Sequence, residues 1–239
     1  MNFLSFNSPF VQGLYKIANM ILVSLLWILF CIPVFTAGAS TVALYYTVQK
    51  NIKNNRGNSW SCFWQSFKDN FRQSTLITLI FLAIAAVLLT DISIINTLSE
   101  MGKINGYARI FFYVVIGILC VYAFWVYAYI ARFRSTMKLA MKNALVLAVM
   151  HFPITLGVAA IGAFSLVLIW LVHVTVFIMP ATSVWMMSFL TEKIFRLYMT
   201  EEDKRNEDER NMEWHDDYEN VQNQSGKNGG RDNRWKKRR

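Results

Sequence analysis

Charged residues are scarce in the first 200 positions of this chain. That region holds 14 Lys and Arg and only 4 Asp and Glu, about 9% of its residues, whereas an average soluble domain is about 25% charged. So little charge excludes an ordinary water-facing surface. The basic residues occupy short segments between apolar runs, so the high pI of about 9.5 indicates orientation in a membrane and no nucleic-acid partner.

Residues that carry chemistry are few and scattered. The cysteines fit no zinc or redox spacing, and their odd number cannot form a complete disulfide set, so we expect all three to be reduced: Cys31, Cys62 and Cys120. His151 and His173 fall at opposite ends of the expected bundle, and His215 lies near the C-terminus. No phosphate-binding loop, zinc motif or nucleophile elbow is present. The sequence therefore predicts no catalytic residues, no metal, no cofactor and no enzyme.

The sequence does contain long stretches without any charged residue. Four of them contain 33, 18, 22 and 49 residues, between Lys16 and Lys50, Arg72 and Asp91, Arg109 and Arg132, and Lys142 and Glu192. A membrane-spanning helix needs about 20 apolar residues. As single helices the longest two runs would measure about 50 and 74 Å, too long for a hydrocarbon core of about 30 Å. Each of these two is therefore expected to form a hairpin.

The predicted fold is all-α, a polytopic transmembrane bundle of six helices. Pro33 and Pro180 mark the two hairpin turns, at about 33–36 and 173–180, because proline interrupts a helix. Five helices are the alternative, if the second segment does not cross. The expected ranges are 9–32, 37–56, 74–98, 108–131, 142–170 and 181–199. No Asp, Glu, Lys or Arg lies near the middle of any of them, which argues against an ion-driven pump.

The distribution of Lys and Arg sets the expected orientation. Segments 50–73 and 132–142 hold five and four basic residues, and such segments concentrate on the cytoplasmic side of a membrane. We therefore expect a multi-pass protein of the cell membrane with its C-terminus in the cytoplasm. The N-terminus would lie inside with six helices and outside with five. Ala37-Gly38-Ala39 resembles a signal-peptide cleavage site, but the uncharged run continues past it, so we expect no cleavage.

Residues 59–72 lie between two predicted spans and have the pattern of an amphipathic helix. Five aromatic residues recur at helical spacing, and two basic residues lie on another face: Trp60, Phe63, Trp64, Phe67 and Phe71, with Lys68 and Arg72. The pattern suits a helix lying in the cytoplasmic interface. The alternative is that the aromatic side chains pack on the protein's own helices. Arg134, Lys138 and Lys142 recur every four residues and form a basic stripe expected to contact lipid headgroups.

The composition changes near Thr200. Residues 201–219 hold ten acidic and three basic residues, and residues 227–239 hold seven basic and one acidic. Apolar residues are few, so we expect a disordered cytoplasmic tail over 201–239. Its basic end could bind anionic lipid; the simpler interpretation is a solvated tail that aids orientation.

The richest polar set within the predicted spans lies near the first hairpin turn. Small and hydroxyl-bearing side chains gather there: Pro33, Thr36, Gly38, Ala39, Ser40, Thr41, Ala43, Tyr45 and Tyr46. Small residues let helices approach closely, and hydroxyl groups form hydrogen bonds between helices. We therefore expect a tight helix-packing interface. A site for a solute or a partner protein is the alternative.

Two segments resemble the YesL-like family of bacterial membrane proteins. Pro33-Val-Phe-Thr-Ala-Gly-Ala-Ser-Thr-Val-Ala-Leu-Tyr-Tyr46 is similar to that family's Pro-x-x-Thr-x-Gly-Ala-Ser-Thr-x-Ala-Leu-Tyr segment. Phe63-Trp-Gln-Ser-Phe-Lys-Asp-Asn-Phe-Arg-Gln-Ser-Thr75 is similar to its Phe-x-x-Ser-Phe-Lys-x-Asn-Phe-Lys-Gln-Ala-Thr segment. The resemblance covers about residues 10–200 and leaves out the charged tail.

The resemblance carries no defined biochemical activity and no catalytic residues. Members of the family often occur beside components of carbohydrate ABC transporters, which implies by association an accessory role in sugar uptake, with membrane lipids and transporter subunits as partners. The competing hypothesis is a small facilitator for a neutral solute, with a path lined by the hydroxyl groups between Thr36 and Thr47.

Overall fold

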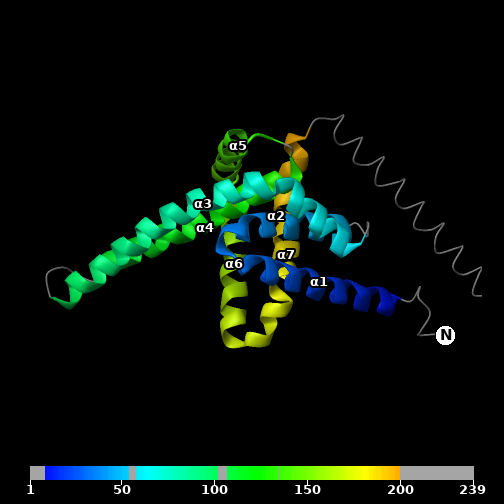
Figure 1. Ribbon diagram of the computed structural model, residues 1–239, viewed down its shortest axis with the longest axis horizontal. Helices are drawn as coiled ribbons and strands as arrows, with labels where there is room; N and C mark the ends of the chain where they lie inside the picture. Colours follow the sequence, from blue (N-terminus) through cyan, green and yellow to red (C-terminus); the bar gives the residue numbers. More distant parts are fainter. Residues whose placement is uncertain (1–8, 54–57, 102–106, 134, 200–239) are drawn as a thin grey trace, which may run out of the picture. The chain divides into compact units, whose positions relative to one another are not determined.

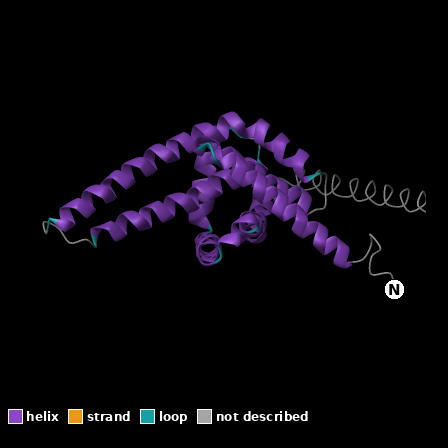
Figure 2. Cartoon of the chain, turned by 60° about the horizontal axis from the view of Figure 1, so that its bottom comes forward, coloured by secondary structure: helices purple, strands orange, loops and turns teal. Residues whose placement is uncertain are grey.

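The structure is a computed structural model that describes residues 9–53, 58–101, 107–133 and 135–199. Every regular element in these residues is helical, which confirms the predicted all-α class (Figures 1 and 2). The chain divides into two compact units, residues 1–194 and 195–239. The predicted tail and Arg134 lie outside the described residues.

In chain order the helices are α1 (Pro9–Cys31), η1 (Val34–Thr36), α2 (Ala37–Thr47), η2 (Val48–Lys53), α3 (Ser59–Glu100), α4 (Ala108–Arg132), α5 (Met137–Met150), α6 (Phe152–Leu171), η3 (His173–Phe177) and α7 (Met179–Tyr198).

Among the described residues, four helices are long and apolar enough to cross a membrane, as expected of a multi-pass membrane protein: α1 from Gly13, α3, α4 and α6. Two of the predicted spans, 37–56 and 181–199, are not among them. With 11 residues, α2 is about 17 Å long. Helix α7 carries Glu192, Lys193 and Arg196 within its 20 residues. The count of six spanning helices therefore stays a prediction.

The turn after α1 lies where Pro33 predicts it. Proline lacks an N–H group and disfavours helical backbone in the residue before it, and α1 ends at Cys31. The Thr36 hydroxyl then lies 2.6 Å from the carbonyl oxygen of Phe30 and 2.7 Å from that of Pro33. It thus satisfies the Phe30 carbonyl oxygen, one of the acceptors that the end of α1 leaves without a helical partner. The chain reverses into α2 within a few residues.

Helix α3 corrects the predicted boundary near residue 73. We expected an interfacial helix over 59–72 and a separate span over 74–98, but the structure has one helix of 42 residues. The physical reason is that this stretch contains no glycine or proline, and the Asn58 side chain accepts a hydrogen bond from the Trp60 N–H at its start. At 1.5 Å per residue α3 measures about 63 Å, twice the thickness of a hydrocarbon core.

The predicted span 142–170 is also corrected, because the structure divides it into α5 and α6 at His151. Pro153 is the second residue of α6 and cannot donate the hydrogen bond that would continue α5. The Thr155 hydroxyl donates to the carbonyl oxygen of Ala148, one of the acceptors at the end of α5, at 2.7 Å. Lys138 and Lys142 therefore lie on a separate helix of 14 residues and not on a helix that continues to residue 170.

Ser24 of α1 caps the start of α7. Its hydroxyl oxygen accepts a hydrogen bond of 3.1 Å from the N–H of Ala181, one of the first four N–H groups of α7, which have no partner within the helix. Both residues are completely buried. The first and last described α-helices are thus joined by a bond that water cannot replace.

We expect Ser24→Ala to lower the free energy of unfolding in mild detergent by about 1 kcal/mol, the usual cost of removing a helix cap. Chemical denaturation followed by tryptophan fluorescence would measure the change. Ser165→Ala is the matched control, because the Ser165 hydroxyl donates only to the carbonyl oxygen of Ile161 in its own helix. Equal losses in the two variants would show that the cap contributes nothing.

Candidate functional site

Helix α2 lies in the middle of the packed helices and contacts α1, α3 and α4 (Figure 1). Most of its residues are buried, and they occur on every side of the helix: Gly38, Ala39, Ser40, Val42, Ala43, Leu44, Tyr45 and Thr47. A helix that is buried all round is an internal element and does not line a surface. Of the other predicted site residues, Thr36 is buried, Thr41 and Tyr46 are half-buried, and Pro33 is exposed.

At Gly38, side chains of α3 and α4 lie directly against the backbone of α2. A methyl group added at this position would overlap the hydroxyl oxygen of Thr78 and lie within 2.8 Å of the Tyr127 ring. These two neighbours are themselves joined, with 2.9 Å between Thr78 Oγ1 and Tyr127 Oη. The Thr78 hydroxyl also donates to the carbonyl oxygen of Ser74, at 2.7 Å. The absence of a side chain at Gly38 therefore lets a buried hydroxyl pair sit against the backbone of α2.

Hydroxyl groups on the opposite side of α2 bind α1. The indole N–H of Trp27 donates to Thr41 Oγ1 at 3.2 Å, and Ser40 Oγ donates to the carbonyl oxygen of Trp27 at 3.1 Å. The Thr47 hydroxyl donates within α2, to the carbonyl oxygen of Ala43 at 2.8 Å. These polar groups thus meet protein partners, as small and hydroxyl-bearing residues do where membrane helices pack.

A buried polar cluster joins α2, α4 and α7. The Tyr45 hydroxyl donates to Glu192 Oε1 at 3.2 Å and lies 2.8 Å from Thr191 Oγ1. The second carboxylate oxygen of Glu192 forms an ion pair with Arg132 Nε at 3.6 Å. Tyr45 and Thr191 are almost completely buried, and the Glu192 and Arg132 side chains are 6% and 16% exposed. The carboxylate therefore receives a cation and a hydroxyl donor from two other helices.

This cluster was missed by sequence reasoning, which treated Glu192 as the end of an apolar run. The signal was available, since Glu192 lies two residues from the midpoint of the predicted helix 181–199. The expectation that no charged residue lies near the middle of a predicted span was therefore wrong for this helix. Nothing local identifies Arg132 as its partner, because the two residues are 60 positions apart. A buried carboxylate paired with one arginine and one tyrosine holds helices in register.

The aromatic residues of 59–72 divide into two groups. Phe63 and Phe67 are buried and pack on Phe30 of α1, with ring centroids 5.8 and 4.8 Å away. Trp60, Trp64 and Phe71 are exposed, and so are the basic neighbours Lys68 and Arg72. Trp64 does both, because its ring lies 5.6 Å from that of Phe30 and 5.9 Å from that of Phe67 while its outer side remains exposed. Each of the two interpretations of this segment thus describes part of it.

The described part of the basic stripe lies on α5. Lys138 and Lys142 are both exposed there, one helical turn apart. The buried residues of α5 lie on the other side: Ala140, Ala144 and Leu147. The two lysines are thus free of tertiary packing and point away from the bundle.

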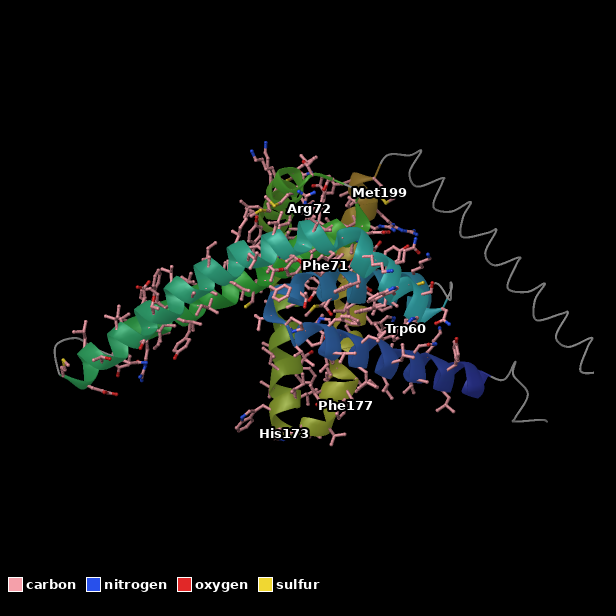
Figure 3. All side chains as sticks on the ribbon, viewed as in Figure 1. Trp60, Phe71, Arg72, His173, Phe177 and Met199 are labelled. Carbon is pink, nitrogen blue, oxygen red and sulfur yellow. The ribbon has the colours of Figure 1, made fainter. Side chains whose placement is uncertain are left out.

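Cysteine and histidine form no cluster in the described part of the chain. Cys31 is half-buried, Cys62 buried and Cys120 exposed, and none of them forms a disulfide. His173 lies in the turn between α6 and α7, where Figure 3 shows it beside Phe177. Over the described residues no three His, Cys, Asp or Glu side chains come together as metal ligands.

In comparison with known protein families, residues 20–92 match a family described as a protein of unknown function, DUF624. The matched region runs from α1 into α3. It covers about a third of the chain and includes the packed helix α2 and both segments compared above with known motifs. No curated protein and no solved structure matches the chain.

Proposed function

We propose that this chain is a non-enzymatic accessory protein of the cytoplasmic membrane, a member of the YesL-like family, that binds the membrane subunits of a carbohydrate ABC transporter. The C-terminus lies in the cytoplasm in this proposal, because the segments richest in Lys and Arg are placed on that side. Its partners are lipids and the transmembrane helices of the transporter.

The observation that supports the proposal most is the burial of α2. The segment that resembles the family, Pro33–Tyr46, forms the most enclosed helix of the described chain. Its hydroxyl groups bind neighbouring helices and backbone carbonyl oxygens. The segment Pro33–Tyr46 thus stabilises the packing of the helix bundle. A rigid bundle presents a fixed outer surface, to which the helices of a larger membrane complex can bind.

The same burial weighs against the facilitator hypothesis. A path for a neutral solute would require hydroxyl groups that face water or the solute. Thr36, Ser40, Thr41, Tyr45 and Thr47 instead bond to atoms of the protein itself. Opening a path along α2 would break several of these bonds at once, so the accessory role is the better-supported proposal.

Co-purification tests the accessory role. An affinity-tagged chain would be expressed at native level, cross-linked in its own membranes and solubilised in mild detergent. We expect mass spectrometry to find the membrane subunits of a carbohydrate transporter enriched at least tenfold, roughly 1.4 kcal/mol of preference, over those recovered with an unrelated tagged multi-pass protein. Recovery of the same subunits at equal level with the unrelated protein would exclude the proposal.

A further inference from the structure

The first fourteen residues of α3 expose an aromatic stripe, whose inner edges contact the buried rings of Phe30 and Phe67. Trp60 is 54% exposed, and Trp64 and Phe71 are each 37% exposed. At about 100° per residue, these three side chains lie within about 40° of one another around the helix axis. We call Trp60, Trp64 and Phe71 the aromatic stripe; Figure 3 shows Trp60 and Phe71 along the same helix.

Two basic side chains lie beside the aromatic stripe on the same helix. Lys68 and Arg72 continue the four-residue spacing of Trp60 and Trp64, and both are exposed. The Lys68 ammonium group lies 4.8 Å from the centre of the Trp64 ring, within cation–π range. The only carboxylate of this segment, Asp69, lies about 100° further round the helix than Lys68. The exposed face thus combines aromatic rings with the positive charges of Lys68 and Arg72 along one side.

The position of the stripe along α3 places it beside the apolar part of the helix. No charged residue occurs between Arg72 and Asp91, a stretch of about 27 Å that matches a hydrocarbon core. The aromatic stripe precedes this stretch directly. Helix α3 is also curved, and in Figure 2 it arches over the neighbouring helices. The two arms of the arch therefore run in different directions, and Figure 3 shows Trp60 on the shorter arm.

We propose that the aromatic stripe, with Lys68 and Arg72, binds the headgroup layer of the membrane and selects anionic lipid. Tryptophan rings favour the boundary between headgroups and acyl chains, and Lys and Arg beside it attract lipid phosphates and other anionic headgroups. Phe63 and Phe67 hold the segment on α1, so the exposed face is presented in a fixed orientation. The proposal does not depend on the transporter partnership.

Tryptophan fluorescence in reconstituted vesicles tests the location of the stripe. The full chain and its Trp60→Phe/Trp64→Phe variant are compared, and the difference spectrum reports the two indoles. We expect blue-shifted emission that is quenched by lipids brominated near the glycerol and much less by aqueous acrylamide. Trp125→Phe is the control, since Trp125 is completely buried and its difference spectrum should respond to neither quencher. Red-shifted emission quenched by acrylamide alone, as expected for a docking site of a soluble protein, overturns the proposal.

Lipid titration followed by native mass spectrometry tests the selectivity. Each cation is expected to contribute about fivefold to the affinity for phosphatidylglycerol over phosphatidylcholine, so Lys68→Gln/Arg72→Gln should lose most of that preference. Asp69→Asn is the control on the same helix and should keep or slightly raise it. Unchanged preference in the double variant overturns the assignment of an anionic-lipid site, whatever the fluorescence shows.

Discussion

Gly38→Ala is expected to destabilise the helix bundle by about 3 kcal/mol or more, the upper range for overpacking a filled core. The new methyl group would occupy the space of the Thr78 hydroxyl and press on the Tyr127 ring. Thr78 cannot rotate away without losing its bonds to Tyr127 and to the Ser74 carbonyl oxygen. The cost therefore combines steric overlap with the loss of buried hydrogen bonds.

Fluorescence-detected size-exclusion chromatography and chemical denaturation in mild detergent would measure this effect. Gly117→Ala is the matched control: Gly117 also lies within a helix, but a methyl group there meets nothing within 4 Å. Since alanine favours helix by up to about 1 kcal/mol relative to glycine, this control should be neutral or stabilising. A Gly38→Ala protein as stable as the control would mean that α2 does not lie against Thr78 and Tyr127 as described.

Glu192→Leu is expected to cost about 3–5 kcal/mol, because removing one member of a buried ion pair leaves the other charge without its counter-ion. Arg132 is nearly buried, with its Nε atom 3.6 Å from the carboxylate, and Tyr45 would lose the acceptor of its hydroxyl proton. Both losses fall on the contact between α7 and the rest of the first unit. The chain should then unfold at lower denaturant concentration or fail to accumulate in the membrane.

A double-mutant cycle separates the ion pair from general damage. Arg132→Leu and Arg132→Leu/Glu192→Leu complete the set, and we expect the double variant to be more stable than the sum of the single losses predicts, by about 1–3 kcal/mol. This is the pattern when two apolar groups replace a buried pair. Additive losses would show that the two side chains do not interact, and the polar cluster would then reduce to Tyr45, Thr191 and Glu192.

The parts of this fold that the sequence predicts are those set by local chemistry. Pro33 stops α1 by removing a donor, so the turn and the start of α2 follow directly from it. The same reasoning applied to Pro153 would have divided α5 from α6. Helix α3 shows where a change of pattern misleads. Residues 59–72 are amphipathic and residues 74–98 are apolar, but both segments have the same helical backbone conformation. A helix can therefore continue although the polarity of its side chains changes along its length.

The parts that could not be predicted depend on contacts between distant residues. Gly38 was recognised as a small residue at a helix interface, but its partners on α3 and α4 follow only from the tertiary packing. Glu192 and Arg132 each occur near the end of an apolar run, where charge is ordinary in a membrane protein. Only the fold shows that they meet, and that Tyr45 reaches the same carboxylate.

The contacts of Tyr45 and Ser24 with α7 can form only late in biosynthesis, because their partners lie far along the chain. The acceptor of the Tyr45 hydroxyl on Glu192 is 147 residues further along the chain, and Ala181, which Ser24 caps, is 157 residues beyond its partner. At about 5–20 residues per second, a ribosome takes roughly 7–30 s to bridge the first of these gaps. Throughout that interval the Tyr45 hydroxyl lacks the carboxylate that accepts its proton in the folded bundle, so the contact between α2 and α7 can form only after the residues of α7 have been made.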